Sequence, residues 1–163
     1  MNFPTTERLH EALDYNPDTG VFTWKIARKG TFKGSIAGFV RPDKYRIICL
    51  DGARFRANRL AWFYMTSKIP LYDIDHKDGN PENNAFFNLR DVTTAQNIQN
   101  QNKPHKRNKS GFFGVSWHKA GKCWRARICT DGVQKVLGYF DTPEEAHKAY
   151  LEAKRILHLA CTI

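Results

Sequence analysis

The sequence predicts an α+β protein made of small sheets and short helices. Runs of alternating apolar residues indicate strands in the first 60 residues and again after residue 110. Apolar residues at helical spacing over 58–67, and a capped helix start at Thr142, indicate helices between and after these strands. Residues 72–100 read as strand, loop, strand and helix. We therefore expect a small β-rich region, a compact ββα unit, and a three-stranded antiparallel sheet with one helix.

The first region is expected to contain two helices and one clear hairpin. Its elements in order are a helix over 5–14, a turn over 15–20, a strand over 21–25, a hairpin over 45–55 and a helix over 58–67. Asp51-Gly52 is the expected hairpin turn, because both residue types tolerate positive φ. Leu60, Phe63 and Tyr64 share the core face of the second helix.

The rest of the chain divides into a middle segment, a linker and a last region. The expected elements are strands over 72–76 and 86–92, a helix over 94–100, strands over 112–118, 123–130 and 134–140, and a helix that begins at Pro143. Residues 99–110 contain no apolar side chain and no acidic one, so they read as a basic linker. The expected boundaries are 1–71, 72–100, 101–110 and 111–163.

Composition excludes several classes of protein. The chain has 163 residues and no run of 18 apolar ones, so no membrane span is expected. The first residues lack the basic and apolar parts of a secretory signal, so a cytoplasmic location is expected, in the host cell if the chain is phage-encoded. The four cysteines form no Cys-x-x-Cys pair, which argues against a zinc knuckle or a disulfide framework.

Charge is distributed unevenly along the chain. Lys and Arg number 26 against 16 Asp and Glu, and the excess lies in residues 1–72 and 101–163. Residues 73–100 carry more acidic than basic side chains. Basic flanks favour binding to a phosphate backbone, and an acidic island between them would repel that backbone unless a cation neutralised it.

The acidic island contains four polar residues suited to phosphodiester hydrolysis: Asp75, His76, Asn88 and Asn97. A neutral imidazole can accept a proton from water near neutral pH, which makes His76 the candidate general base. Oxygen atoms of Asp75 and Asn97 suit Mg²⁺ or Mn²⁺. On a regular strand Asp75 points away from His76, so a bulge or strand end near residues 77–79 is needed to unite them. Asn88 is better placed to hydrogen-bond backbone across the loop.

Single Asp-His pairs are common, and Asn83-Asn84 and residues 78–81 are ordinary turn residues. The prediction of a hydrolytic site therefore depends on the combined spacing of these residues and not on any one of them. That spacing, from Ile74-Asp75-His76-Lys77-Asp78-Gly79 through Asn88-Leu89-Arg90 to Gln96-Asn97, resembles the core of HNH endonucleases of the phage and intron-encoded homing type. The resemblance implies a ββα-metal fold with His76 as base, Asp75 and Asn97 as metal ligands, and Asn88 as the residue that orders the loop. Family members often have histidine where this chain has Asn58.

The last region resembles the Apetala-type (ethylene-response-factor) DNA-binding domain. The resemblance rests on Gly114-Val115, Trp124, Arg127-Ile128, residues 137–142 and residues 144–150. Strand alternation directs Val115, Trp117, Trp124, Ala126, Ile128, Leu137 and Tyr139 towards the helix. Candidate DNA-contacting residues are Ser116, His118, Lys122, Arg125 and Arg127 on this region and Lys106, Arg107 and Lys109 of the linker. A solvated sheet face is the alternative for the arginine pair.

Together these features predict a metal-dependent endonuclease that hydrolyses double-stranded DNA with Mg²⁺ or Mn²⁺. One active site per chain predicts nicking by a monomer, whereas a dimer could cut both strands. The alternative function is a non-catalytic DNA-binding or regulatory protein on the same scaffold; an RNA-directed role ranks below both.

Overall fold

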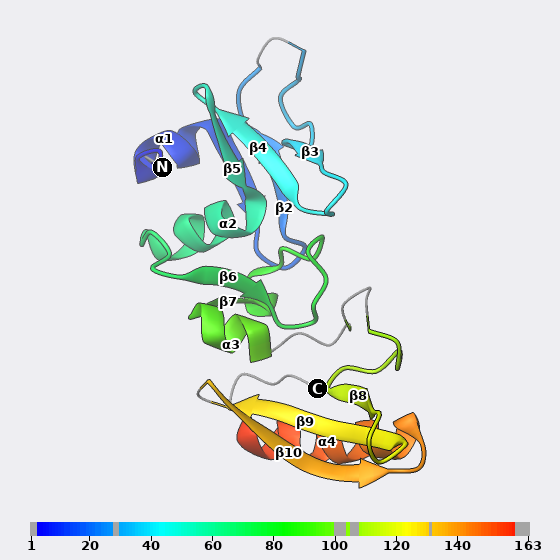
Figure 1. Cartoon of the computed structure of the whole chain (residues 1–163). Coiled ribbons are helices and arrows are strands. Elements are labelled where there is room, and N and C mark those ends of the chain that lie inside the picture. The colour runs from blue at the N-terminus through cyan, green and yellow to red at the C-terminus, as the bar shows by residue number, and fades with distance from the viewer. Residues whose placement is uncertain (1–2, 28–29, 100–103, 105–107, 131, 159–163) are drawn as a thin grey trace. The chain divides into compact units, whose positions relative to one another are not determined.

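The computed structural model of the chain describes residues 3–27, 30–99, 104, 108–130 and 132–158. It has the expected α+β composition, with small antiparallel sheets and short helices (Figure 1). The chain divides into two compact units, Met1–Thr94 and Ala95–Ile163, which are called unit 1 and unit 2. Within the described residues, no helix has the length and apolar character needed to cross a membrane.

Unit 1 begins with a helix and a hairpin. Helix α1 spans Thr6–Ala12, strand β1 spans Leu13–Asn16 and strand β2 spans Val21–Trp24. The prediction of helix to residue 14 and of turn from residue 15 was wrong, because β1 pairs antiparallel with β2. Alternate residues of β1 are buried, so the pairing places two of its side chains in the core.

The second sheet of unit 1 has the order β3-β4-β5. Its strands are β3 (Phe39–Val40), β4 (Arg46–Leu50) and β5 (Ala53–Arg56). Asp51 and Gly52 connect β4 to β5 with φ angles of 49° and 81°. This confirms the predicted Asp-Gly hairpin, since two left-handed residues match the twist of the flanking strands.

Helix α2, Ala57–Thr66, follows β5 directly and packs on β4, β5 and the next strand. Leu60 and Phe63 are buried as predicted, while Tyr64 is half-buried against the core. The elements of unit 1 share one apolar core, which includes Leu9, Leu13, Phe22, Ile48, Leu50, Phe55, Leu60, Ile74 and Leu89. The first region and the strand pair that follows it are therefore held together by a common core.

The strand pair at the end of unit 1 consists of β6, Asp73–His76, and β7, Leu89–Val92. The predicted strand over 86–92 begins three residues later than expected, because Phe86–Asn88 form a 3-10 turn, η1. The backbone N–H of Phe86 donates to Pro17 O at 2.8 Å, and that of Asn88 donates to Ala85 O at 2.9 Å. These bonds satisfy the backbone donors of residues 86 and 88 outside a strand ladder.

Helix α3 spans Thr94–Gln99 and continues into unit 2. Unit 2 also contains an antiparallel sheet in the order β10-β9-β8 and helix α4, Pro143–Leu157. The strands are β8 (Val115–His118), β9 (Cys123–Thr130) and β10 (Val133–Phe140). Thr142 Oγ1 accepts from Glu145 N at 3.3 Å and Pro143 begins α4, as the sequence predicts.

One prediction of strand alternation in unit 2 was wrong. The pairing of β10 with β9 shifts between Val136 and Gly138, so Leu137 is an extra residue on β10. Tyr139 therefore pairs with Arg125 on the face away from the buried Ala126, and Phe140 packs on the core in its place. A β-bulge reverses the parity of every residue that follows it.

Candidate functional site

Strand β6 places Asp75 and His76 on opposite faces. Ile74 and His76 are buried, and Asp75 lies on the other face, opposite Arg90 in the register of β6 with β7. The strand is regular through His76, and its end is marked by the bond from Gly79 N to His76 O at 2.9 Å. Alternation thus holds through His76. The strand then ends at residues 77–79, the position at which a bulge or a strand end was expected from the sequence.

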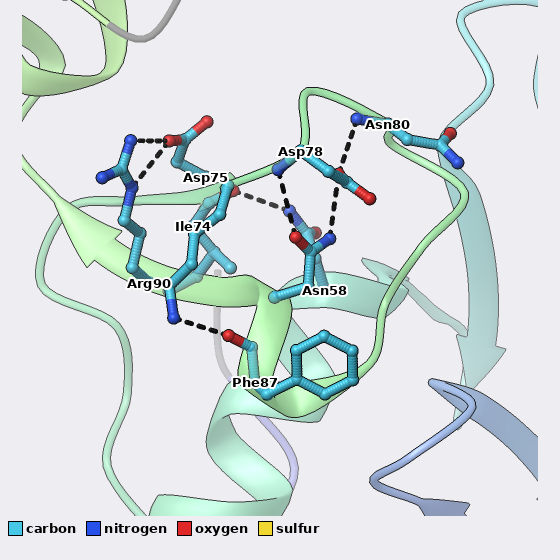
Figure 2. Close-up of polar contacts among 9 residues, drawn as sticks. Asn58, Ile74, Asp75, Asp78, Asn80, Phe87 and Arg90 are labelled. Carbon is cyan, nitrogen blue, oxygen red and sulfur yellow. Dashed lines mark hydrogen bonds and ion pairs between the residues drawn. The ribbon is translucent and has the colours of Figure 1, made fainter. Parts of the chain in front are cut away.

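The Asp75 carboxylate forms an ion pair with Arg90 (Figure 2). Nε and Nη2 of Arg90 donate to Asp75 Oδ2 at 2.9 and 2.8 Å. The two side chains are only 11% and 19% exposed, so the pair is shielded from water. Sequence reasoning missed Arg90 as a site residue. Its cross-strand position opposite Asp75 follows only once the register of β6 with β7 is known.

The imidazole of His76 is held by Asn84, which sequence reasoning took for an ordinary turn residue. His76 Nε2 lies 3.1 Å from Asn84 Oδ1, and both side chains are 3% exposed. Asn84 Nδ2 donates to Glu82 O at 3.3 Å, so Oδ1 is the atom that faces the ring. Because a carbonyl oxygen only accepts, His76 Nε2 carries the proton in this bond. In the neutral ring the basic lone pair is then on Nδ1.

Burial lowers the pKa of His76 below the usual value for histidine. The hydrogen bond to Asn84 and the charges of Asp78 and Asp75 oppose this effect without cancelling it. A desolvated imidazole is easier to keep neutral than a solvated one, because burial penalises the charged form. The ring is therefore in its proton-accepting state at neutral pH.

The N-terminal hairpin supports the segment that carries Asn84. Tyr15 Oη donates to Asn84 O at 2.7 Å, a contact that spans 69 positions in the sequence. Gly20 has a φ of +72°, and a Cβ added there would lie 2.2 Å from the carbonyl carbon of Asn84. Only glycine allows the β1–β2 turn to approach this closely. The turn thus fixes the backbone that positions the His76 partner.

Asn88 closes the loop between β6 and β7, as its place in the sequence predicts. Its Oδ1 accepts from Asp78 N at 3.1 Å, and its Nδ2 donates to Asn83 O at 2.8 Å and to Asp78 Oδ1 at 3.0 Å. The side chain is 3% exposed. All three contacts lie within the loop, so Asn88 acts on its shape.

Asp78 is the charged member of this loop network (Figure 2). Burial alone would raise its pKa, but hydrogen bonds from Asn80 N, Asn83 Nδ2 and Asn88 Nδ2 lower the pKa below the usual value. The carboxylate therefore stays ionised, and its negative charge acts to raise the pKa of His76.

Asn58, where related sequences often have histidine, has a positioning role in unit 1. It is buried on α2, and its Nδ2 donates to Ile74 O at 2.8 Å (Figure 2). This bond joins α2 to β6 at the residue that precedes Asp75. The resemblance to HNH endonucleases drew attention to position 58, but it did not predict the contact with Ile74.

Asn97 lies on α3 and belongs to unit 2, whereas Asp75 belongs to unit 1. Its pairing with Asp75 around one cation therefore remains a prediction. The start of α3 is joined to β6 within unit 1, where Thr94 Oγ1 donates to Asp73 Oδ2 at 3.4 Å. Across the described residues, no group of three or more His, Cys, Asp or Glu side chains is placed to hold a metal ion.

Four of the predicted DNA-contacting residues lie on the sheet of unit 2. Ser116 pairs with Arg125 across β8 and β9, and Arg127 Nη1 donates to Gln134 Oε1 at 2.9 Å. Ser116 Oγ and Arg125 Nε are buried and have no hydrogen-bond partner among the described residues. His118 ends β8, with its ring 5.0 Å from the Tyr139 ring. Arg125 and Arg127, two positions apart on β9, thus share one face of the sheet.

The other predicted DNA-contacting residues lie in turns or outside the description. Lys122 is exposed in the β8–β9 turn with a φ of 48°, and Lys109 is exposed in the turn before β8. Lys106 and Arg107 lie outside the described residues.

Comparison with known proteins finds a family model that matches the loop and its flanking strands. Residues 55–99 match the HNH endonuclease family model. The matched segment runs from β5 to α3, so it includes Asp75, His76, Asn88 and Asn97.

Two individual proteins are also similar to the chain. "Protein 3.8" of Escherichia phage T7 is 42% identical over 74 residues, which are 45% of this chain. The chain covers 60% of the length of that relative. A solved structure described as "DNA binding and cleavage by the HNH homing endonuclease I-HmuI" shares 24% identity and a TM-score of 0.47, over 98% of this chain and 95% of that one.

Proposed function

We propose that the protein is a divalent-cation-dependent endonuclease that hydrolyses phosphodiester bonds of double-stranded DNA. The observation that carries this proposal is the His76–Asn84 pair, a buried neutral imidazole held through Nε2 within a segment that matches HNH endonucleases. General-base catalysis needs an oriented imidazole in its neutral form.

In this mechanism His76 accepts a proton from the attacking water. Nδ1 is the accepting atom, because Nε2 already donates to Asn84. As Nδ1 gains the proton, the imidazolium that forms is stabilised by the nearby carboxylates of Asp75 and Asp78. Asn88 keeps Asp78 and the loop backbone in place during this step.

The residues present suit a hard divalent cation, which Asp75 and Asn97 would hold. Carboxylate and amide oxygens are the ligands that Mg²⁺ and Mn²⁺ prefer, and Mg²⁺ usually keeps several waters around one or two protein ligands. When bound, the cation stabilises the charge on the phosphate and on the departing oxygen. Arg90 orients Asp75 and compensates its charge.

Unit 2 is proposed to bind the DNA backbone and bases, as its resemblance to Apetala-type domains implies. Arg125 and Arg127 lie two positions apart on β9 and therefore share one face of the sheet, from which they would contact a phosphate or a base edge. Such contacts by arginine either position the duplex or read guanine.

Plasmid nicking tests the proposed function. We expect the wild-type protein to nick supercoiled DNA with Mg²⁺ and to be inactive with EDTA. Asp75→Ala and Asn97→Ala are each expected to slow nicking by about 10³-fold, because several kcal/mol of stabilisation by the cation is lost. Glu7→Ala, which removes an exposed carboxylate on α1 of unit 1, is the matched control and should leave the rate unchanged.

The alternative is a non-catalytic DNA-binding protein on the same scaffold. A wild-type protein that binds duplex DNA but leaves plasmid uncut with both Mg²⁺ and Mn²⁺ would establish that alternative. Equal nicking rates for the wild-type protein and Asp75→Ala would show that Asp75 is not a ligand of the catalytic cation.

Asn84→Ala is expected to lower kcat for nicking by about ten- to a hundredfold, the usual cost of losing a partner that orients a catalytic side chain. The KM for plasmid should change little, since Asn84 is buried and contacts His76 rather than solvent. Asn84→Asp keeps an acceptor for Nε2 and should recover part of kcat. A kcat that is equal in Asn84→Ala and wild type would exclude the positioning role.

A further inference from the structure

A cation is stacked on an aromatic ring directly beside His76. The guanidinium carbon of Arg56 lies 4.4 Å from the centre of the Tyr45 ring. The same ring lies 5.9 Å from the centre of the His76 imidazole. Together these two distances place the guanidinium carbon no more than about 10 Å from the imidazole centre.

The β4–β5 hairpin produces this arrangement. Arg56 is the last residue of β5 and pairs with Ile47 of β4. Tyr45 precedes Ile47 by two positions, so its side chain lies on the same face of the sheet as that of Arg56. Strand pairing thus brings the arginine over the ring, and an aromatic face restricts where the guanidinium can lie.

Arg56 is exposed and forms no ion pair with any carboxylate of the described residues. Its planar fork of donors is therefore available to an external acceptor. Other arginines of unit 1 bond a carboxylate or a backbone carbonyl of the fold, as Arg8 does with Asp51 and Arg59 does with Tyr72 O.

The distance to His76 indicates which acceptor fits. Successive nucleotides of one DNA strand are about 3.4 Å apart along the helix axis, so a guanidinium about 10 Å away reaches a phosphate within about three nucleotides of one held at His76. A guanidinium also matches the geometry of phosphate oxygens through two parallel hydrogen bonds.

We propose that Arg56, held in place by Tyr45, binds a backbone phosphate of DNA next to the cleavage site. The inference rests on the proposed endonuclease function, because it takes His76 as the point of attack. Arg56 is a substrate-positioning residue in this scheme and takes no part in proton transfer.

The chain offers a matched control on the same strand. Arg54 is also exposed, lies two positions before Arg56 and therefore shares its face of β5. It pairs with Cys49, and among the described residues no aromatic ring lies beneath its guanidinium. A general effect of positive charge should appear equally in both variants, whereas a built phosphate site should appear only in Arg56→Ala.

The first test is binding of a short DNA duplex of arbitrary sequence in EDTA, measured by fluorescence anisotropy over a range of KCl concentrations. In Arg56→Ala, the slope of the logarithm of the association constant against log[KCl] is expected to become less negative by about one. This change is the signature of one lost phosphate contact. Arg54→Ala should keep the wild-type slope. Arg56→Lys retains the charge without the fork and should weaken binding less than Arg56→Ala.

The second test is plasmid nicking with Mg²⁺. Arg56→Ala should raise KM about tenfold with a smaller change in kcat, because a phosphate away from the reacting bond contributes to binding before it contributes to chemistry. Tyr45→Leu removes the supporting ring while leaving Arg56 in place, and it should raise KM in the same direction.

Equal salt slopes and equal KM values for Arg56→Ala and Arg54→Ala, in a background where the wild type nicks DNA, would overturn the inference and leave the proposed function standing. A wild-type protein that binds duplex but does not nick would instead remove the proposed function, while a less negative slope in Arg56→Ala would still demonstrate the phosphate contact. Absence of binding by the wild type would overturn both.

Discussion

Replacing His76 with alanine is expected to slow plasmid nicking by about 10²–10⁴-fold, the usual contribution of a positioned general base. The loss should appear in kcat, because the buried imidazole contributes to proton transfer and not to capture of the duplex. Single-turnover nicking with Mg²⁺, at enzyme concentrations that saturate the plasmid, measures this step directly. DNA binding in EDTA should remain at the wild-type level.

Two controls separate chemistry from folding in this experiment. His10→Ala removes a histidine of the same unit whose ring centre lies 3.9 Å from that of Tyr64, and it should nick normally. Thermal denaturation followed by circular dichroism shows whether His76→Ala is folded at the assay temperature. A folded His76→Ala protein that retains a tenth or more of the wild-type rate would show that another group accepts the proton.

Replacing Asn88 with alanine is expected to lower the free energy of unfolding by about 2–4 kcal/mol. The variant removes three hydrogen bonds in a buried position and leaves the carbonyl of Asn83 and the N–H of Asp78 without their partner. An unsatisfied buried polar group costs more than the net value of the bond it has lost. Urea denaturation of the purified protein measures the change.

Asn80→Ala is the matched control for this prediction. Asn80 lies in the same loop, is exposed, and accepts one hydrogen bond from Glu82 N at 3.1 Å. Its removal should change stability by about 0.5 kcal/mol or less, the usual range for an exposed position. Equal effects of Asn80→Ala and Asn88→Ala would mean that the loop is not organised by the buried amide. Asn88→Asp should be as damaging as the alanine variant, since it removes both N–H donors and places a second carboxylate beside Asp78.

The elements that the sequence predicted well are those defined by neighbouring residues. The Asp51-Gly52 turn, the cap at Thr142 and the apolar face of α2 each depend on side chains within a few positions of one another. The regularity of β6 is of the same kind, because alternation alone separates Asp75 from His76. The loop contacts of Asn88 extend only to residues 78 and 83.

The elements that sequence reasoning missed depend on partners far along the chain. Strand β1 forms where a helix end and turn were expected, because β2 pairs with it and the shared core buries its alternate residues. The turn at Phe86–Asn88 replaces the first part of a predicted strand, since Pro17 O takes the N–H of Phe86. Tyr139 faces away from the buried Ala126 because of a bulge at Leu137, which no local pattern marks.

The amino-acid order by itself determined the chemistry available to this protein: an acidic segment between basic flanks, an imidazole next to a carboxylate, and amides spaced to reach them. Only the tertiary structure decided which atoms meet. Asn84 lies beside His76 because the β1–β2 hairpin contacts the Asn84 backbone. Arg90 lies opposite Asp75 because of the strand register, and Arg56 lies over the Tyr45 ring, which is next to the imidazole. Each of these pairings joins residues 8 to 69 positions apart, and only packing of the whole unit brings such distant residues close together.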